Sequence, residues 1–285
     1  MSSPSPMAAR TDLVELPTTM FAGYIFDLDG TIYLGEELLP GALEVIDAIR
    51  AAGRRLLFLS NNPTRDAGAY VTKLGMMRIA IEPHEILTTV TTMTDWLLRF
   101  HPEATVFPIS EEPLKRSLAN AGIRISEDPG EIDIVIASYD RGFDYRKLQI
   151  AFDAIHVHKR ARLVTTNPDR FCPFPGGRGE PDAAAIVGAI EGCTGVRCEQ
   201  NVGKPDPFML EAALARLGLT ADECLLVGDR LTTDIRMANA AGMPSALVLT
   251  GETTMEMMTV HPGVDRPDWV LNQIDEILRS FPQEG

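Results

Sequence analysis

The stretch Tyr24–Thr31 reads Tyr-Ile-Phe-Asp-Leu-Asp-Gly-Thr and places two carboxylates, Asp27 and Asp29, where a short apolar run ends. Side chains at positions i and i+2 of an extended backbone point the same way, so the two carboxylates can face one site. Gly30 then allows a sharp turn, because glycine adopts backbone conformations that other residues avoid. A solvated turn is the simpler interpretation, since Asp and Gly are ordinary turn residues. The segments downstream decide between the two.

Length, charge and cysteine content narrow the class of protein. A chain of 285 residues with 45% hydrophobic side chains can fold as one large domain or two moderate ones. The formal net charge of −14 argues against nucleic acid and anionic membranes as partners, because both require a basic face. The four cysteines form no CxxC pair, and Met1–Asp12 lacks the apolar stretch of a signal peptide. We therefore expect a cytoplasmic protein without a disulfide framework.

Strand and helix signals alternate along nearly the whole chain, which predicts an α/β fold with a parallel sheet. The expected strands are near-continuous apolar runs, as is typical of strands buried on both faces: Tyr24–Asp27, Arg55–Ser60, Cys224–Gly228 and Ser245–Leu249. Amphipathic helices are expected between them. One begins near Ala42 and ends before Gly53, and another runs from Asp206 as N-cap to Gly218.

The interval between Ser60 and Lys204 is 143 residues long, far more than one crossover helix needs. It contains an alternation of its own, which predicts a second α/β domain inserted into the first. The expected elements, strand and helix in turn, are Thr105–Ile109, Glu112–Ala121, Asp133–Ser138, Tyr145–His156, Leu163–Thr166 and Asp182–Cys193. We place the core domain at residues 1–100 and 199–285, and the inserted domain at residues 101–198.

Three expected strands of the core end in or lead into a polar side chain: Asp27, Ser60 and Asp229. Ligands of open parallel sheets bind beyond the carboxyl ends of the strands, so these side chains should share one crevice. Lys204, just before a capped helix, would add an ammonium group there, although a solvated loop lysine is the alternative. Such a set suits phosphoryl transfer, in which Mg²⁺ takes hard oxygen ligands and cations neutralise the phosphate.

The needs of that chemistry assign a role to each group. Asp27 is the candidate nucleophile, which would form an aspartyl phosphate, and Asp29 is the candidate general acid and base. Asp229 would hold the metal together with the Asp27 carboxylate and the backbone carbonyl of Asp29. Asp234 would tune the metal through its bound waters, unless it only favours the start of a helix. The phosphoryl oxygens would be held by the remaining polar groups: Ser60, Asn61 and Lys204.

Four segments resemble, in order, the four motifs of the haloacid dehalogenase (HAD) superfamily: Asp27–Thr31, Leu59–Asn62, Gly203–Pro205 and Val227–Asp234. The Ser-Asn-Asn form of the second motif, the large insert, and the Thr-Asn-Pro-Asp segment at 166–169 resemble its NagD-like, type-IIA phosphatases. The resemblance covers most of the chain from Phe21 to Ser280. It implies a Rossmann-like parallel-sheet core, a mobile cap domain of the C2 type, dependence on Mg²⁺ and hydrolysis of phosphomonoesters.

Carried over residue by residue, the resemblance makes Asp27 the nucleophile and Asp29 the acid and base. The magnesium ligands that it implies are Asp27, Asp29 and Asp229. The phosphate-binding residues that it implies are Ser60, Asn61, Lys204 and Gly30. The implied partner is a small phosphorylated metabolite, such as a sugar or polyol phosphate, phosphoglycolate, a nucleoside monophosphate or pyridoxal phosphate, with p-nitrophenyl phosphate as an in vitro substrate. The resemblance also implies a homodimer formed through the cap.

Two alternatives to a phosphatase use the same residues. A non-catalytic phospholigand-binding or regulatory protein could keep the site, but it would not need an acid and base such as Asp29 beside the nucleophile. A phosphotransferase to an acceptor other than water would share the whole core. Dehalogenation is disfavoured, because displacement of a halide requires no second aspartate to protonate a leaving alkoxide.

Phe171 and Cys172 are the candidate residues for substrate specificity. They follow the expected strand Leu163–Thr166 at the start of a Pro/Gly-rich loop, Cys172–Gly179. In the resembled family this segment reaches toward the core and contacts the substrate beyond its phosphate. Phe171 would offer an apolar face and Cys172 a small, weakly polar one. The alternative is that both are simply buried, as Phe and free Cys usually are.

Overall fold

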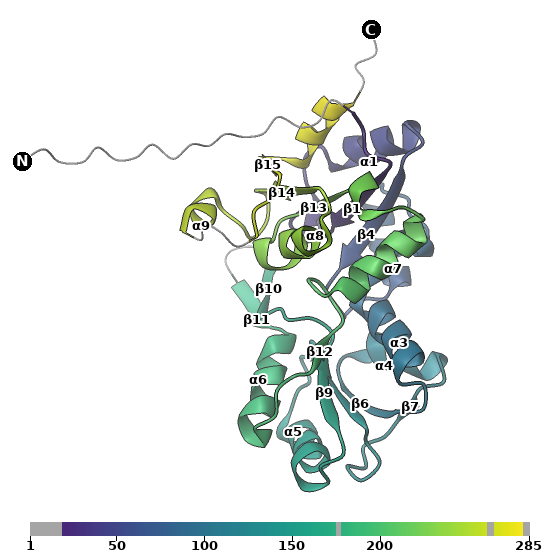
Figure 1. Cartoon of the computed structure of the whole chain (residues 1–285), viewed down its shortest axis with the longest axis vertical. Coiled ribbons are helices and arrows are strands. Elements are labelled where there is room, and N and C mark those ends of the chain that lie inside the picture. The colour runs from purple at the N-terminus through teal and green to yellow at the C-terminus, as the bar shows by residue number, and fades with distance from the viewer. Residues whose placement is uncertain (1–18, 175–177, 261–264, 282–285) are drawn as a thin grey trace, which may run out of the picture.

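The computed structural model describes residues 19–174, 178–260 and 265–281, so the expected tail Met1–Asp12 lies outside it. Two sheets, each built of parallel strands, follow one another along the long axis of the molecule (Figure 1). The larger sheet takes strands from the two ends of the described chain, and the smaller sheet takes strands from its middle. The parallel α/β, Rossmann-like fold expected from the sequence is therefore confirmed.

The larger sheet has six strands, all parallel, in the order β15–β14–β13–β1–β4–β5. In that order their bounds are Trp269–Leu271, Ser245–Val248, Cys224–Gly228, Gly23–Asp27, Arg55–Ser60 and Ile86–Thr88. The four expected strands agree with β1, β4, β13 and β14 to within one residue at each end. The two edge strands, β5 and β15, are too short to show a periodic pattern, so the sequence does not predict them.

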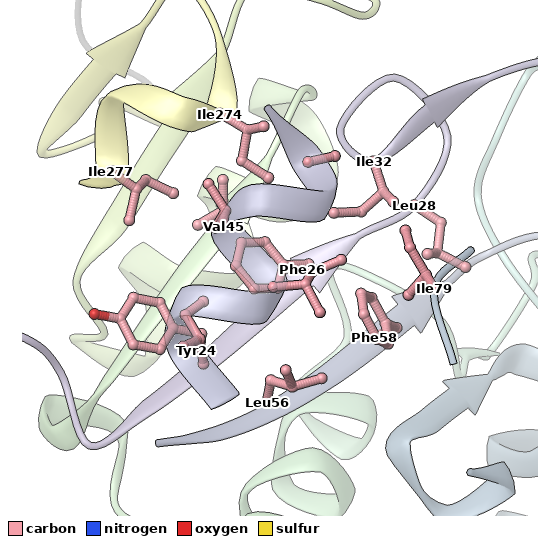
Figure 2. Packing of buried hydrophobic residues seen from close by; sticks show 14 of the residues in the cluster. Tyr24, Phe26, Leu28, Ile32, Val45, Leu56, Phe58, Ile79, Ile274 and Ile277 are labelled. Carbon is pink, nitrogen blue, oxygen red and sulfur yellow. The ribbon is translucent and has the colours of Figure 1, made fainter. Parts of the chain in front are cut away.

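Helices cover both faces of this sheet: α1 (Ala42–Ala51) and α2 (Ala67–Met76) on one, α7 (Pro207–Leu217) and α8 (Arg236–Ala241) on the other. Successive residues of a strand point to opposite faces, so Phe26 packs with α1 while Ile25 packs with α7. Figure 2 shows the first of these layers, in which the side chains of β1 and β4 meet Val45 of α1. Burial of each large apolar side chain stabilises the fold by about 1.5–3 kcal/mol.

The ends of α7 follow from its sequence. Asp206 is the N-cap and its side chain accepts a hydrogen bond from the N–H of Phe208 at 2.9 Å, while Pro207 occupies the first helical position. Gly218 ends the helix in the left-handed conformation, which glycine adopts without strain. This helix therefore starts directly after the turn that carries Lys204.

The smaller sheet has five parallel strands in the order β12–β9–β8–β6–β7. In that order their bounds are Gln200–Asn201, Arg162–Thr165, Ile134–Ala137, Thr105–Ile109 and Arg124–Ile125. Its helices are α4 (Glu112–Asn120), α5 (Tyr145–Phe152) and α6 (Ala183–Thr194). The expected helix Tyr145–His156 is thus divided, because a π-helical turn at Asp153–Val157 follows α5.

Two elements that lie outside residues 101–198 in the sequence contact the smaller sheet in the structure. Helix α3 (Thr89–Phe100) starts directly after β5 and packs its buried side chains, among them Met93 and Leu97, against β6, β8 and α4. Strand β12 pairs with β9. The domain limits at 101 and 198 remain a prediction.

The prediction of a loop at Cys172–Gly179 is wrong for the residues that the structure describes, because they belong to an antiparallel pair of strands. β10 (Phe171–Phe174) pairs with β11 (Arg178–Pro181), with Cys172 opposite Glu180, and residues 175–177 lie outside the described residues. Neither strand shows the alternation of apolar and polar residues that would predict it from the sequence, so each is defined by its hydrogen bonds to the other. Proline and glycine weaken strand propensity, which is why the composition indicates a loop.

No helix in the described ranges is both long and apolar enough to cross a membrane. A small antiparallel pair, β2 (Tyr33–Leu34) and β3 (Glu37–Leu38), follows β1 directly. The short helix α9 (Met255–Val260) follows β14.

Candidate active site

The carboxyl ends of three central strands bring the expected polar residues together. β13, β1 and β4 are neighbours in that order, and parallel strands end at the same edge of a sheet. Asp27 is the last residue of β1 and Ser60 is the last of β4, while Asp229 directly follows β13. All three are buried. Lys204 comes from the turn before α7, and its Nζ donates a hydrogen bond to Oδ1 of Asp27.

Three carboxylates, from Asp27, Asp229 and Asp234, each offer an oxygen within 4.8 Å of the others. Oδ2 of Asp229 accepts a hydrogen bond from the N–H of Glu252 at 2.6 Å. Its buried Oδ1 has no hydrogen-bond partner within the described parts of the chain. A buried acceptor without a donor, beside two further carboxylates, fits a hard divalent cation that takes oxygen ligands.

The electrostatics of this group also fit a cation. Burial, reinforced by the charge of Asp234, raises the pKa of Asp229 to about 7. Burial also raises the pKa of Asp27 well above its ordinary value, although the charge of Lys204 opposes that shift. Ionisation of these carboxylates is therefore costly in the protein alone, and a bound divalent cation would lower that cost.

Two glycines leave the space that the Asp229 carboxylate occupies. Gly30 has a φ of +88°, and a Cβ there would lie 2.6 Å from Oδ2 of Asp229. A Cβ on Gly251 would lie 1.9 Å from the same oxygen. The N–H of Gly30 donates to the carbonyl of Tyr33 at 2.7 Å, and its carbonyl accepts from the Thr250 hydroxyl at 2.6 Å. Gly30 therefore shapes the carboxylate site, and its N–H is engaged within its own turn.

Lys204 joins two of the three carboxylates. Besides its bond to Asp27, its Nζ donates to Oδ1 of Asp234 at 2.7 Å, and the side chain is buried. Burial alone would lower the pKa of Lys204, but the charges of Asp234 and Asp27 raise it on balance, so the ammonium stays protonated. Gly228 allows Asp234 to approach, since a Cβ on Gly228 would lie 2.3 Å from Cγ of Asp234.

Asn61 fixes the turn that carries Lys204. Its Oδ1 accepts from the Lys204 N–H at 2.8 Å, and its Nδ2 donates to the Lys204 carbonyl and to Oδ2 of Asp169, each at 3.1 Å. Ser60, the residue before it, shares a hydrogen bond of 2.7 Å with the hydroxyl of Tyr70 on α2. The side chain of Asn61 thus hydrogen-bonds to the backbone of Lys204, whereas the hydroxyl of Ser60 hydrogen-bonds to Tyr70 of α2.

The side chain of Asp29 is not part of the group of three carboxylates. Its Oδ2 accepts a hydrogen bond from the Tyr33 hydroxyl at 2.9 Å. Burial raises the pKa of Asp29, while the charge of Lys73 and the hydrogen bond from Tyr33 oppose the shift. A carboxyl with a raised pKa that lines a cavity is suited to proton transfer.

Two cavities adjoin at this edge of the larger sheet. The smaller, of about 50 Å³, is lined by Asp27 and Lys204 among other residues. The larger, of about 300 Å³, extends along β2, the turn that follows it and α2. Asp29, Asn62 and Cys172 line both. Asp29 therefore lies where the space beside the candidate nucleophile meets the larger space, which could take the rest of a substrate.

Residues between β9 and α6, on the side of the smaller sheet but outside its five strands, contribute to the same cavities. Asp169 reaches the core through an ion pair of 3.0 Å with Nη1 of Arg230 and through its bond to Asn61. Phe171 and Cys172, on β10, both line the smaller cavity. Phe171 is 46% exposed, so it is not a core residue, and Cys172 is half-buried. The structure thus brings Phe171 and Cys172 to the site that also contains Asp27 and Asp29.

Burial changes two titratable groups on this side of the site. It raises the pKa of Cys172 to about 12, so the thiol is protonated at neutral pH. It also raises the pKa of Asp182, the N-cap of α6, to about 7. Asp182 lines the smaller cavity and shares the Asn167 side-chain amide with Asp169, at 3.2 and 3.1 Å.

Several residues of the site are not predicted by the sequence reasoning. Arg230 directly follows Asp229 at a strand end, and that position is the signal that could have indicated it. Tyr33 and Lys73 carry no such signal, because their contacts with the site depend on a turn and on the face of a helix. The set missed is Tyr33, Tyr70, Lys73, Asp182 and Arg230.

Comparison with known proteins agrees with this geometry. The family model of haloacid dehalogenase-like hydrolases matches residues 24–124, and the model of HAD-hydrolase-like proteins matches residues 201–277. The sugar-phosphatase AraL of Bacillus subtilis is 34% identical over 264 residues, which cover 93% of this chain and 94% of AraL. The chain belongs to the haloacid dehalogenase-like hydrolases. The resemblance to its NagD-like, type-IIA phosphatases is also confirmed.

Two solved structures of this family are similar over nearly the whole chain. A 4-nitrophenylphosphatase from Thermotoga maritima has a TM-score of 0.84 and 32% identity, with 90% of this chain and 96% of that chain covered. A glycerol phosphate phosphatase from Mycobacterium tuberculosis, solved in complex with magnesium, has a TM-score of 0.81 and 29% identity, with 90% and 76% covered. The described fold is thus shared with these two phosphatases of the family.

Proposed function

We propose that this HAD-type phosphatase hydrolyses a small phosphomonoester, of the sugar or polyol phosphate class, with Mg²⁺ and through an aspartyl phosphate on Asp27. The observation that carries the proposal is the buried centre of three carboxylates and one lysine, in which Oδ1 of Asp229 has no donor among the residues that the structure describes. Asp27 and Asp229 would hold the metal, together with the backbone carbonyl of Asp29. Asp234, bonded to Lys204, would act on the metal through its waters.

Mg²⁺ would supply a positive charge that keeps the carboxylates ionised and neutralises the phosphate. Lys204 holds Oδ1 of Asp27, so the other carboxylate oxygen is the one available for attack on phosphorus. As the Asp27–phosphorus bond forms and the ester bond breaks, Asp29 gives its proton to the leaving oxygen. Asp29 then takes a proton from the water that attacks the aspartyl phosphate, which releases phosphate and restores Asp27.

The remaining polar groups of the smaller cavity would hold the phosphoryl oxygens. Lys204 supplies charge and Ser60 a hydroxyl, and Asn61 orients the Lys204 turn. Gly30 would act by keeping the turn beside Asp229 free of a side chain. The larger cavity of about 300 Å³ would take the alcohol part of the substrate.

The names of the relatives support the substrate class, since AraL is a sugar phosphatase and a structural relative is a glycerol phosphate phosphatase. Residues on the side of the smaller sheet, Phe171 and Cys172, would select among such esters. We further propose that this side is a C2-type cap that closes over the core. The homodimer through the cap stays a prediction, which sedimentation at micromolar concentration would check.

A phosphate-release assay on the purified protein tests the proposal. p-Nitrophenyl phosphate and a panel of sugar, polyol and nucleoside phosphates are offered with Mg²⁺ and with EDTA. We expect release that requires Mg²⁺ and is fastest with one class of sugar or polyol phosphate. Binding of phosphate esters without release would support a non-catalytic protein instead, and equal release in EDTA would contradict the metal.

A further inference from the structure

Tyr33 is fully buried and makes one hydrogen bond that bears on the chemistry, from its hydroxyl to Oδ2 of Asp29 at 2.9 Å. Its position follows from the turn after β1. The N–H groups of Thr31, Ile32 and Tyr33 all donate to the carbonyl of Leu28, at 2.9–3.2 Å. The N–H of Gly30 closes the same turn through its bond to the Tyr33 carbonyl. Four backbone bonds therefore fix the distance between Tyr33 and Asp29.

Helix α2 holds the Tyr33 ring from the other side. Nζ of Lys73 lies 3.6 Å from the centroid of the ring and donates to the carbonyl of Gly35 at 2.7 Å. Lys73 is itself buried, so this contact is shielded from solvent. One turn earlier on the same helix face, Tyr70 shares its hydroxyl with Ser60 at 2.7 Å. The two tyrosines thus offer a comparison: one hydroxyl bonds to Asp29 and the other to Ser60.

The hydrogen bond from Tyr33 decides which oxygen of Asp29 can carry a proton. A protonated carboxyl has one O–H donor and one carbonyl-type acceptor. If Tyr33 donates to Oδ2, that oxygen must be the acceptor, and the proton of the acid resides on Oδ1. Asp29 lines both cavities, where the ester oxygen of a substrate beside Asp27 would lie.

We propose that Tyr33 is a positioning residue for Asp29, which confines the transferable proton to Oδ1 and holds that oxygen toward the leaving group. The inference rests on the proposed phosphatase function and deepens it. In the first step the proton on Oδ1 passes to the leaving oxygen as the phosphorus–ester bond breaks and the Asp27–phosphorus bond forms. In the second step Oδ1 takes a proton from the attacking water as the Asp27–phosphorus bond breaks. Tyr33 keeps its own proton throughout.

The test is Tyr33→Phe, which keeps the ring and its contact with Lys73 and removes only the hydroxyl. An alkyl phosphate needs a proton on its leaving oxygen, whereas p-nitrophenolate scarcely needs one. We expect kcat/KM, which reports the steps up to departure of the alcohol, to fall about 10-fold or more with glycerol phosphate, if that ester is a substrate in the panel, or with the best alkyl ester found, and by less than about threefold with p-nitrophenyl phosphate. Tyr70→Phe is the matched control, because its hydroxyl serves Ser60, and its loss should be equal for the two esters.

Two results would overturn the inference. One is an equal loss of kcat/KM with alkyl and aryl esters in Tyr33→Phe, which would show a general structural role. The other comes from the double variant Asp29→Asn/Tyr33→Phe. If Tyr33 acts through Asp29, the double variant should be no slower with the alkyl ester than Asp29→Asn alone, whereas independent roles would multiply the losses. Failure of the proposed function has a different signature, since the unmodified protein would then release no phosphate from either ester.

Discussion

The two sides of the site are built differently. On the core side, Asp27 and Ser60 end buried parallel strands, and Lys204 is held by side-chain and backbone bonds from Asn61 and Asp234. On the other side, Phe171 and Cys172 stand on a two-stranded ladder of four residues each, outside the smaller sheet. A side chain fixed by many buried contacts can hold reacting atoms in place, while a less supported one can vary with the substrate. The comparison assigns chemistry to the first side and selectivity to the second.

The largest effect should come from the metal site on the core side. Asp229→Asn keeps the shape of the side chain and removes its charge, so we expect Mg²⁺ binding to weaken strongly and kcat at fixed Mg²⁺ to fall about 10²–10³-fold. Calorimetric titration with Mg²⁺ and phosphate release measure the two effects. Asp265→Asn, which breaks an ion pair of 2.8 Å with Arg236, is the control. Unchanged Mg²⁺ affinity in Asp229→Asn would show that Asp229 is not a ligand of the metal.

The metal-free protein provides a check that Asp229→Asn is folded. Because the folded protein holds the pKa of Asp229 at about 7, above its ordinary value, it binds a proton that the unfolded chain has lost. Stability in EDTA should therefore fall as pH rises from about 4 to about 7, and the loss should be complete above it. The variant should melt above the unmodified protein at pH 8, and the difference should shrink at pH 5. A lower Tm of the variant at pH 8 would contradict the claim that the ionised Asp229 carboxylate destabilises the metal-free protein.

The second effect concerns the acid and base. Asp29→Asn should lower kcat/KM for alkyl phosphates about 10²–10⁴-fold, the usual contribution of a general acid and base. The loss should be smaller for p-nitrophenyl phosphate, whose leaving group is already stable as an anion. Steady-state kinetics with the two esters give the measurement. An equal loss for both would show that Asp29 acts in another way.

A third, smaller effect tests the contact between the two sides. Asp169→Asn removes the charge that pairs with Arg230 at 3.0 Å, and it weakens the acceptor for Asn61. We expect a fall of about 10-fold in kcat/KM, because neutralisation of Asp169 leaves the partly buried guanidinium of Arg230 with only its ion pair to Glu252 among the described residues. Asp265→Asn again serves as the control, since its ion pair with Arg236 lines neither cavity. Equal kinetics of the two variants would indicate that the contact between the sides has no role in turnover.

The smallest effects are expected on the side of selectivity. Phe171→Ala and Cys172→Ala should change kcat/KM for the preferred metabolite several times more than for p-nitrophenyl phosphate. Little change in Tm is expected, because Phe171 is 46% exposed, whereas truncation of a buried Phe costs about 3–5 kcal/mol. A panel of esters and thermal melts measure both. If both substrates suffer together with a marked loss of stability, the residues support the fold and do not select.

The difference between the core side and the side of Phe171 and Cys172 also explains how far the sequence predicts the structure. Asp27, Ser60 and Asp229 follow long apolar runs, and the edge at which parallel strands end is a general property of the fold. The hairpin at Phe171 is not predicted, because its strands contain proline and glycine and are defined by pairing with each other.

The partners of the site residues are the other part that sequence reasoning misses. The pairing of Tyr33 with Asp29 depends on a turn closed by four backbone bonds, and no residue pattern shows which hydroxyl it brings to the carboxylate. Arg230 is visible as a neighbour of Asp229, but its contact with Asp169 joins residues 61 positions apart. Such contacts require the tertiary structure.

The most direct test of the central claim is to trap the phosphoryl group on Asp27. The protein is mixed with p-nitrophenyl phosphate and Mg²⁺, quenched in acid and reduced with borohydride, which converts an aspartyl phosphate to homoserine. Peptide mass spectrometry should find homoserine at position 27 in the unmodified protein, and none in Asp27→Asn, which should also lose turnover by about 10⁴-fold or more while remaining folded by circular dichroism. Homoserine at another aspartate, or full turnover in Asp27→Asn, would contradict the account.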